Sequence, residues 1–173
     1  MRVPYRQAVS QSGVLEALGA FDPHVAGTPP LGIDIATSDI DILCAHADPD
    51  AFTAAVVSAF GNSQSFKISQ WRGAPRAIVA RFIAAGWEFE IFAQDVPVAE
   101  QSGWRHFLVE RRLIALGGDA LREAVIAAKL KGLKTEPAFV QVMGLGGDPY
   151  EAMLVLETQS DDALRELLVR AGL

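Results

Sequence analysis

The chain has 173 residues, half of them hydrophobic, so it is long enough for one well-filled domain and short for two. Its formal net charge is −6, whereas proteins that bind long nucleic acid through its phosphates usually carry a basic excess, so we expect no long nucleic acid as a partner. The N-terminal residues lack the pattern of a signal peptide, and no run of roughly 18 apolar residues could cross a bilayer, so we expect a cytoplasmic protein without membrane association.

The first half of the chain alternates between helical and strand-like patterns. Apolar residues recur at helical intervals up to Leu18, and Asp48 followed by Pro49 is typical of a helix N-cap with proline in the first turn. The turn formers Gly73-Ala74-Pro75 and Gly86 separate the last three strand-like runs, so these strands are mostly antiparallel. The first predicted element is a helical pattern over 4–18, which is either one helix or two short pieces divided at Ser12-Gly13. The elements that follow are strands over 24–26 and up to 44, a helix over 49–60, and strands over 65–71, 77–83 and 87–93.

The second half changes to helix from residue 97 onwards. Strands first and helices after predict an α+β fold, with a mixed β-sheet of about five strands, flanking helices and a helical C-terminal half. We expect a single domain over 1–173, with the sheet core in 1–95 and the helical part in 96–173. The predicted helices run over 100–116 and 119–133, divided by Gly117-Gly118, and over 137–143, and two more begin after the cap-like residues Asp148 and Ser160.

A pair of aspartates lies in the alternating strand that ends at residue 44. Asp39 and Asp41 are two residues apart between apolar neighbours, so both carboxylates point to one face of the strand. Two like charges this close repel each other, whereas a divalent cation would be bound by the oxygens of both. The alternative interpretation is a solvated pair on the open face of an antiparallel sheet. Asp34, earlier in the same segment, either turns the loop or approaches the metal.

Gly27 and Thr28 precede this strand. A glycine lets the backbone approach a ligand closely, and exposed amides beside a hydroxyl suit phosphate oxygens. Pro29 and Pro30 follow, at positions where a first helical turn tolerates proline, and they remove two backbone donors near the predicted phosphate site. The segment therefore combines a phosphate-type loop with a metal-type strand.

The spacing within this segment resembles a known signature. Gly27-Thr28, ten intervening residues and Asp39-Ile40-Asp41 resemble the Gly-Ser or Gly-Gly to Asp-x-Asp signature of the polymerase-β-like nucleotidyltransferase superfamily. The phrases Glu100 to His106, Leu133 to Phe139 and Gly147 to Tyr150 resemble those of a small, uncharacterised bacterial family within that superfamily, a domain of unknown function. The resemblance covers most of the chain and implies a nucleotidyltransferase-like mixed sheet.

The resemblance also implies a metal site. Asp39 and Asp41 would bind magnesium, two ions in all, in the presence of a nucleoside triphosphate (NTP) as substrate. Glu90, from a later alternating strand, would be the third carboxylate and a possible base toward the acceptor. Glu88 shares the strand face of Glu90 and is the alternative third carboxylate.

Three residues would contact the triphosphate by the same resemblance, namely Gly27, Thr28 and Lys134. Lys134 falls in the family-like phrase Lys-Thr-Glu-Pro, and its alternative role is to cap the C-terminal end of a helix, where a cation complements the helix dipole. The remaining cations of the middle strands and the long helical stretch are expected to be surface charge. They are Arg72, Arg76, Arg81, Lys129 and Lys131.

His106 and Glu136 are less readily assigned. His106 lies on a predicted helix and is expected to be a structural residue or part of the site wall, and Glu136 to fix the turn before Pro137. No second histidine or cysteine stands at a zinc-like spacing, so we predict no zinc site. Cys44 is the single cysteine and ends a buried strand, so we expect a core residue.

These features predict a magnesium-dependent nucleotidyltransferase that moves a nucleoside monophosphate from an NTP to a small molecule or a protein hydroxyl. One alternative is a non-catalytic nucleotide-binding or regulatory module with the same fold, which the two prolines near the phosphate loop favour. The other is a metal-dependent phosphohydrolase or phosphotransferase that uses the same carboxylates.

Overall fold

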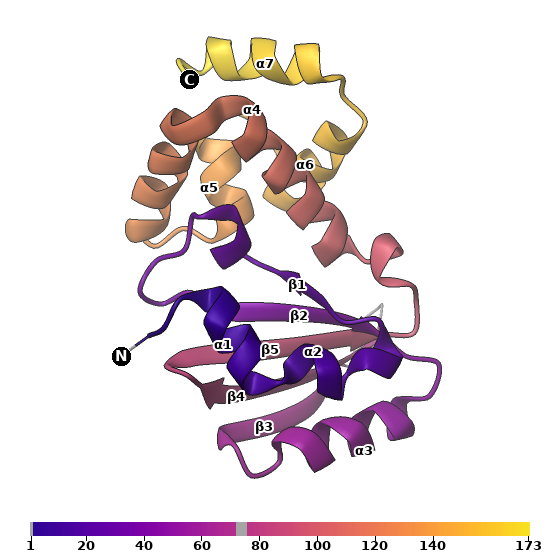
Figure 1. Cartoon of the computed structure of the whole chain (residues 1–173). Helices are drawn as coiled ribbons and strands as arrows, with labels where there is room; N and C mark the ends of the chain where they lie inside the picture. Colours follow the sequence, from indigo (N-terminus) through magenta and orange to yellow (C-terminus); the bar gives the residue numbers. More distant parts are fainter. Residues whose placement is uncertain (1, 72–75) are drawn as a thin grey trace. The chain divides into compact units, whose positions relative to one another are not determined.

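A computed structural model describes residues 2–71 and 76–173 (Figure 1). The predicted turn Gly73-Ala74-Pro75 and the cation Arg72 lie outside the described residues. The chain divides into two compact units. Met1–Pro30 with Ser38–Trp104 forms the sheet unit, and Leu31–Thr37 with Arg105–Leu173 forms the helical unit. The chain therefore passes between the units three times, and the single domain expected from the sequence stays a prediction.

The sheet unit is built on five strands in the order β1-β2-β5-β4-β3. Strands β2 and β5 are parallel and every other neighbouring pair is antiparallel, which confirms the predicted mixed sheet and the antiparallel run of the last three strands. A helix and two strands lie between β2 and β5 in the chain, which gives the long connection that a parallel pair needs. The strands are β1 His24–Ala26, β2 Ile40–Ala45, β3 Gln64–Trp71, β4 Ala77–Ala84 and β5 Trp87–Gln94.

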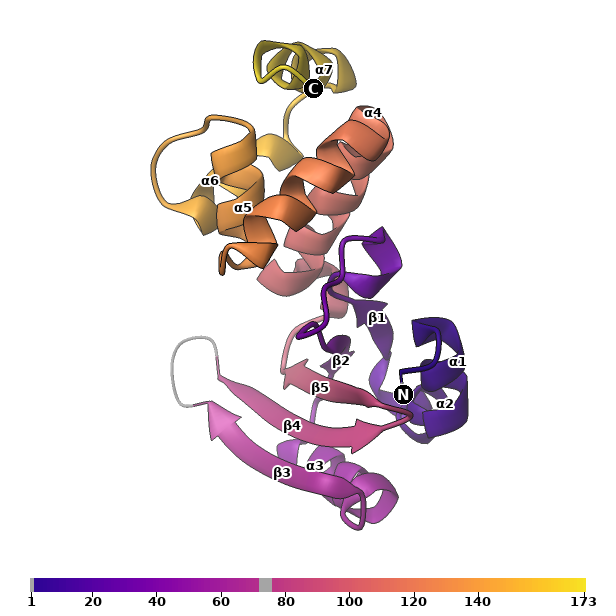
Figure 2. The same cartoon turned by 90° about the vertical axis from the view of Figure 1, so that its left-hand side faces the viewer.

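Three helices cover one face of this sheet and enclose the core of the unit (Figure 2). Phe82 of the sheet stacks on Phe60 and Phe89, with ring centroids 4.5 and 5.0 Å apart. The helical pattern predicted over 4–18 forms two helices divided at Gly13, which is one of the two predicted alternatives, because the φ of +65° at Gly13 ends the first helix in a left-handed conformation. The helices are α1 Tyr5–Ser12, α2 Val14–Ala17 and α3 Pro49–Phe60, and Asp48 caps α3 as predicted.

Strand β2 separates apolar from acidic side chains. Ile40, Ile42 and Cys44 are fully buried in the core beneath the helices. Burial, with a smaller contribution from the charge of Asp22, raises the pKa of the Cys44 thiol to about 12, so Cys44 is the buried core residue that the sequence predicts. Because side chains alternate along a strand, Asp41 lies on the opposite, open face.

The helical unit contains α4 Ser102–Leu130 in large part, α5 Thr135–Val142, α6 Pro149–Glu157 and α7 Asp161–Arg170. The two helices predicted on either side of Gly117-Gly118 are the two halves of α4, which is broken at Gly118, where φ is +58°. Asp148 and Ser160 cap α6 and α7 as predicted. Helix α5 begins two residues before the predicted start, because Pro137 falls in its first turn, where proline is tolerated. No helix in the described part of the chain combines the length and hydrophobicity that a bilayer span needs.

The segment Leu31–Thr37 belongs to the helical unit although it connects two parts of the sheet unit. Ile33 is fully buried, and its carbonyl accepts a hydrogen bond of 3.1 Å from Nζ of Lys129 on α4. The carbonyl of Leu31 accepts one of 3.5 Å from Nε of Arg122. Two cations of α4 thus hold the segment that links Thr28 to Asp39. The expectation that Lys129 is surface charge was wrong, because its ammonium is buried against the Ile33 carbonyl.

Candidate functional site

The predicted carboxylates lie together on the open face of the sheet unit. Asp41 of β2 is directly opposite Glu90 of β5 in the parallel register, and Asp39 immediately precedes β2. Glu88 lies two residues before Glu90 on the same strand face and is more exposed, 52% against 22% of the side chain. The structure therefore brings Asp39, Asp41 and Glu90 to one region and makes Glu90, rather than Glu88, the direct neighbour of Asp41.

Gly27 lies against the Asp41 carboxylate. Its φ is +75°, and a β-carbon at this position would overlap Oδ2 of Asp41 and lie 3.0 Å from its Cγ. Only glycine combines this backbone conformation with so close an approach. The glycine loop and the aspartate strand, which the sequence paired by spacing alone, are in contact.

Thr28 ties the two ends of the intervening segment together. Its side chain is buried, and Oγ1 donates a hydrogen bond of 3.1 Å to Oγ of Ser38, the residue before Asp39. Arg2 donates to the backbone carbonyl of Ser38. Pro29 and Pro30 form a 3-10 turn with Leu31 directly after Thr28, as their fixed φ angles allow. The Thr28 hydroxyl is thus engaged with Ser38 in this structure.

Arg81 of β4 binds the third carboxylate. It is opposite Glu90 in the antiparallel register, its Nε donates to Glu90 Oε2 at 2.7 Å, and its Nη2 donates to the same oxygen. Nε also lies 3.7 Å from Oε1 of Glu88. The hydrogen bond with Glu90, supported by the charges of Glu90, Glu88 and Asp39, holds the pKa of Arg81 above its ordinary value. The residue expected to be surface charge is thus the counter-ion of this acidic cluster.

The donor set fits magnesium chemically, because carboxylate oxygens are the ligands this hard cation prefers. In the part of the chain that the structure describes, no three His, Cys, Asp or Glu side chains are arranged to hold a metal ion. The Glu90 carboxylate is turned to the Arg81 guanidinium, which binds its Oε2. Asp39 and Asp41 are the residues that would hold a metal, with Gly27 giving their oxygens room.

The remaining predicted residues lie in the helical unit. Lys134 is exposed and precedes α5 as its N-cap residue, so it does not cap the C-terminal end of a helix. Asp34 is exposed in the segment Leu31–Thr37. The roles assigned to both residues at a phosphate or a metal stay predictions.

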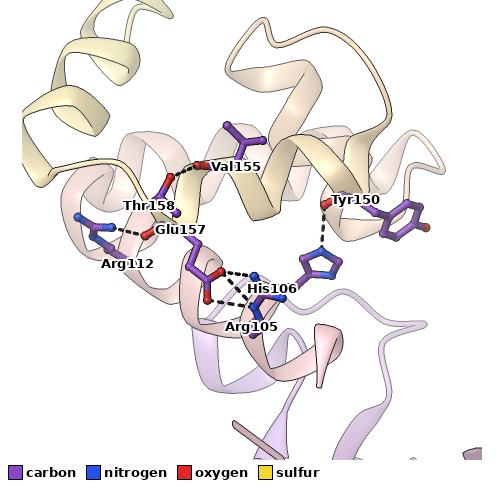
Figure 3. Close-up of polar contacts among 7 residues, drawn as sticks. All are labelled: Arg105, His106, Arg112, Tyr150, Val155, Glu157 and Thr158. Atoms are coloured by element: carbon purple, nitrogen blue, oxygen red, sulfur yellow. Dashed lines mark hydrogen bonds and ion pairs between the residues drawn. The ribbon is translucent and has the colours of Figure 1, made fainter. Parts of the chain in front are cut away.

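His106 joins three helices of the helical unit (Figure 3). The ring is 7% exposed, its Nε2 donates to the carbonyl of Tyr150 on α6 at 3.0 Å, and its Nδ1 lies 3.5 Å from Oε1 of Glu136 on α5. Burial is the largest influence on the pKa of Glu136 and raises it, but the hydrogen bond with His106, the backbone, and the charges of His106 and Lys134 together outweigh it and lower that pKa. His106 is therefore a packing residue of the helical unit.

Arg105, the neighbour of His106 on α4, also connects this helix to α6. Its Nε lies 3.2 and 3.1 Å from the two carboxylate oxygens of Glu157, and its Nη2 lies 2.5 Å from one of them (Figure 3). Arg112 donates to the backbone carbonyl of Glu157. One residue of each family-like phrase, namely His106, Glu136 and Tyr150, therefore takes part in holding α4 to α5 and α6 inside the helical unit.

The sequence matches the profile of a family described as Domain of unknown function (DUF4269) over residues 7–156. The chain belongs to this family. The match covers the sheet, α4, α5 and nearly all of α6, and leaves α7 of this DUF4269 protein outside. No curated protein matches the sequence.

Solved structures resemble the DUF4269 chain in fold. The Cid1 poly(U) polymerase bound to MgGTP aligns with a TM-score of 0.61 at 13% identity, over 81% of this chain and 48% of that one. A chain of the GLD-2/RNP-8 complex aligns with a TM-score of 0.57 at 9% identity, over 96% and 75%. A cytoplasmic RNA terminal U-transferase aligns with a TM-score of 0.54 at 13% identity, over 80% and 45%.

These likenesses show that the DUF4269 chain has a nucleotidyltransferase-like α+β fold, as the resemblance of its motifs implied. The chain spans about half the length of the Cid1 polymerase and of the terminal U-transferase. Sequence reasoning did not single out Ser38 or Arg2, and it assigned Arg81 to the surface. Arg81 could have been predicted as the partner of Glu90 only from the register in which its strand pairs with the Glu-x-Glu strand.

Proposed function

We propose that this protein is a metal-dependent nucleotidyltransferase that transfers a nucleoside monophosphate from an NTP to a hydroxyl of a small molecule or a protein. The observation that carries the proposal is the contact of Gly27 with the Asp41 carboxylate, on the same sheet face as Glu90. A phosphate-type loop, a pair of aspartates and a third acid within one region are the parts that this transfer requires. The neighbours in fold, among them a poly(U) polymerase bound to MgGTP, support an NTP with magnesium as the ligand.

Each residue has a proposed part in the reaction. Asp39 and Asp41 hold magnesium, which when bound offsets the charge of the phosphates and supports attack on phosphorus. The backbone amides at Gly27 and Thr28 contact the phosphates and orient the α-phosphorus toward the acceptor. Glu90 is the third carboxylate of the metal site and accepts the proton of the acceptor hydroxyl as the oxygen bonds to the α-phosphorus and pyrophosphate leaves. Lys134, in the helical unit, is the proposed side-chain contact of the triphosphate.

The alternative of a non-catalytic module would be favoured by third carboxylates that point away from the aspartates. Glu90 shares the open face with Asp41, which supports the enzyme over the module. The alternative of a phosphohydrolase uses the same residues, and product analysis separates the two. Release of pyrophosphate indicates nucleotidyl transfer, and release of orthophosphate indicates hydrolysis.

The first test is calorimetric binding of each nucleoside triphosphate with magnesium to the intact chain. We expect binding that requires the metal and that is lost in Asp39→Asn/Asp41→Asn, with circular dichroism confirming that the variant is folded. Asp50→Asn is the matched control, because it makes the same change at an exposed aspartate of α3, which covers the other face of the sheet, and it is expected to bind as the wild type does. Absence of binding for every triphosphate, or equal binding by the double variant, contradicts the proposal.

A further inference from the structure

The open face of the sheet unit carries a row of charged side chains across four strands. Asp41 of β2 is opposite Glu90 of β5, Glu90 is opposite Arg81 of β4, and Arg81 is opposite Lys67 of β3. Side chains directly opposite each other in a sheet are close neighbours, so Glu90 lies between a carboxylate on one side and a guanidinium on the other. Its carboxylate has two possible partners, a metal held by the aspartates or the guanidinium.

In the described structure Glu90 is bound to the guanidinium. Two nitrogens of Arg81 donate to the same oxygen, Oε2, and the Nε distance is 2.7 Å. A hydrogen bond in which both partners are charged is roughly twice as strong as a neutral one, and the planar fork of arginine fixes its direction. Both hydrogen bonds fall on Oε2, so a metal bound through that oxygen would compete with Arg81 for its lone pairs.

Arg81 is also surrounded by the other acids of the site. Its Nε lies 3.7 Å from Oε1 of Glu88, and the charge of Asp39 acts on it as well. The Arg81 guanidinium therefore already places one positive charge close to Glu90, Glu88 and Asp39.

We propose that Arg81 is a positioning residue that holds Glu90 away from Asp39 and Asp41 in the metal-free protein, so that Arg81 sets the affinity of the site for its metal. The inference rests on the proposed function, because it needs a metal bound by the two aspartates. Metal binding then requires Glu90 to exchange its partner, and the guanidinium that Glu90 releases faces the same open sheet surface. Metal affinity is therefore lower than the three acids alone would give.

If the Arg81–Glu90 pair had only a structural role, removing the guanidinium would lower thermal stability and leave metal affinity unchanged. The Arg81 side chain is 53% exposed, and an exposed ion pair contributes little to the free energy of unfolding because water and salt screen it. Removal of the guanidinium should leave thermal stability nearly unchanged. Its effect on metal affinity is direct, because the carboxylate that Arg81 binds is the one proposed to reach the metal.

The experiment is calorimetric titration of the intact chain with Mn²⁺ alone, for wild type, Arg81→Gln and Lys67→Gln. Lys67→Gln is the matched control, because it removes the same charge from the next position in the row and leaves Glu90 bound to Arg81. We expect about three- to tenfold tighter binding in Arg81→Gln and less than about twofold in Lys67→Gln. Arg81→Lys, which keeps the charge and loses the fork, should fall between wild type and Arg81→Gln.

A second pair of variants isolates Glu90. In a Glu90→Gln background, Arg81→Gln should no longer tighten Mn²⁺ binding, because no carboxylate is left for the guanidinium to hold. Equal affinities of wild type and Arg81→Gln, or equal gains in Arg81→Gln and Lys67→Gln, overturn the inference and leave the proposed function standing, provided that Asp41→Asn abolishes Mn²⁺ binding. Absence of binding that depends on Asp41 in both wild type and Arg81→Gln overturns the proposed function and the inference with it.

Discussion

Gly27 and Asp41 are in direct contact, and the contact leaves no room for a side chain at residue 27. A β-carbon there would overlap Oδ2 of Asp41, and the φ of +75° would be strained for any residue with a side chain. The close approach places the loop backbone beside the acid that is proposed to hold the metal. The sequence spacing between the glycine and the aspartates thus corresponds to a direct contact between Gly27 and Asp41 in the structure.

Gly27→Ala is expected to destabilise the protein and to abolish nucleotide binding. Backbone strain and overlap with Asp41 together should lower the free energy of unfolding by about 2–5 kcal/mol. Gly13→Ala is the matched control, because Gly13 has a φ of +65° but nothing within 4 Å of a β-carbon, so only strain of about 1–2 kcal/mol is added. Urea denaturation measures both. Equal destabilisation by the two variants would show that overlap with Asp41 adds nothing to the loss of unfolding free energy in Gly27→Ala.

The hydrogen bond between Thr28 and Ser38 closes the segment between the glycine loop and the aspartates. We expect Thr28→Val to lower the free energy of unfolding by about 1 kcal/mol, because it leaves a buried hydroxyl of Ser38 without this donor. Ser38→Ala should have a similar effect, and the double variant should be less destabilised than the sum of the two. Thr37→Val, at an exposed threonine beside Ser38, is the control. Additive effects of Thr28→Val and Ser38→Ala would contradict a direct bond between the two hydroxyls.

Local signals in the sequence were sufficient for most of the elements. Caps at Asp48, Asp148 and Ser160 fix the starts of three helices, because a capping side chain acts on the amides of its own first turn. Alternation of apolar residues fixes which face of β2 is buried, and short connections fix the antiparallel run of strands. Each of these depends on residues only a few positions apart.

The partners of the charged side chains depend on long-range packing and were out of reach. Arg81 meets Glu90 only because β4 and β5 pair in one particular register. His106 meets the carbonyl of Tyr150, 44 positions away in the chain, through the docking of α6 on α4. For the same reason no pattern in the sequence indicates that the segment Leu31–Thr37 packs with the helical unit.

The contact of Glu136 with His106 predicts a dependence of stability on pH. The pKa of Glu136 is lowered in the folded protein from its ordinary value of 4.5, so its contribution to the free energy of unfolding is present above about pH 4.5 and is lost as the pH falls through the lowered pKa. We expect wild type to be more stable than Glu136→Gln at pH 6–7, with a difference that shrinks progressively below about pH 4.5. Urea denaturation between about pH 3 and pH 7 measures it.

The control for this prediction is Glu123→Gln, which changes an exposed glutamate of α4. It is expected to shift stability little at any pH, because an exposed charge is solvated in both the folded and the unfolded states. A stability difference between wild type and Glu136→Gln that stays constant down to pH 3 would contradict a lowered pKa. Such a result would indicate that Glu136 contributes to the free energy of unfolding through packing and not through its charge.

Lys129 holds the segment between the phosphate loop and the aspartates to α4. Its buried ammonium donates to the carbonyl of Ile33, which is fully buried, so Lys129→Met leaves that carbonyl without a charged donor. We expect a loss of about 1.5–3 kcal/mol in the free energy of unfolding. Lys131→Met, two residues further on and exposed, is the control and is expected to change it by less than about 0.5 kcal/mol.

The same variant tests whether the helical unit influences the candidate site through this segment. Thr28 and Asp39 stand on either side of the segment Leu31–Thr37, so loosening its hold on α4 lets the phosphate loop and the aspartate strand fluctuate more in their spacing. We expect folded Lys129→Met to bind Mg-NTP more weakly than Lys131→Met does. The loss in affinity should be larger for Mg-NTP than for Mn²⁺ alone, because the triphosphate requires both the loop and the aspartates, whereas the metal requires only the aspartates. Equal losses for nucleotide and metal would place the effect at the aspartates alone, and unchanged affinity for both would show that the site keeps its geometry without this attachment.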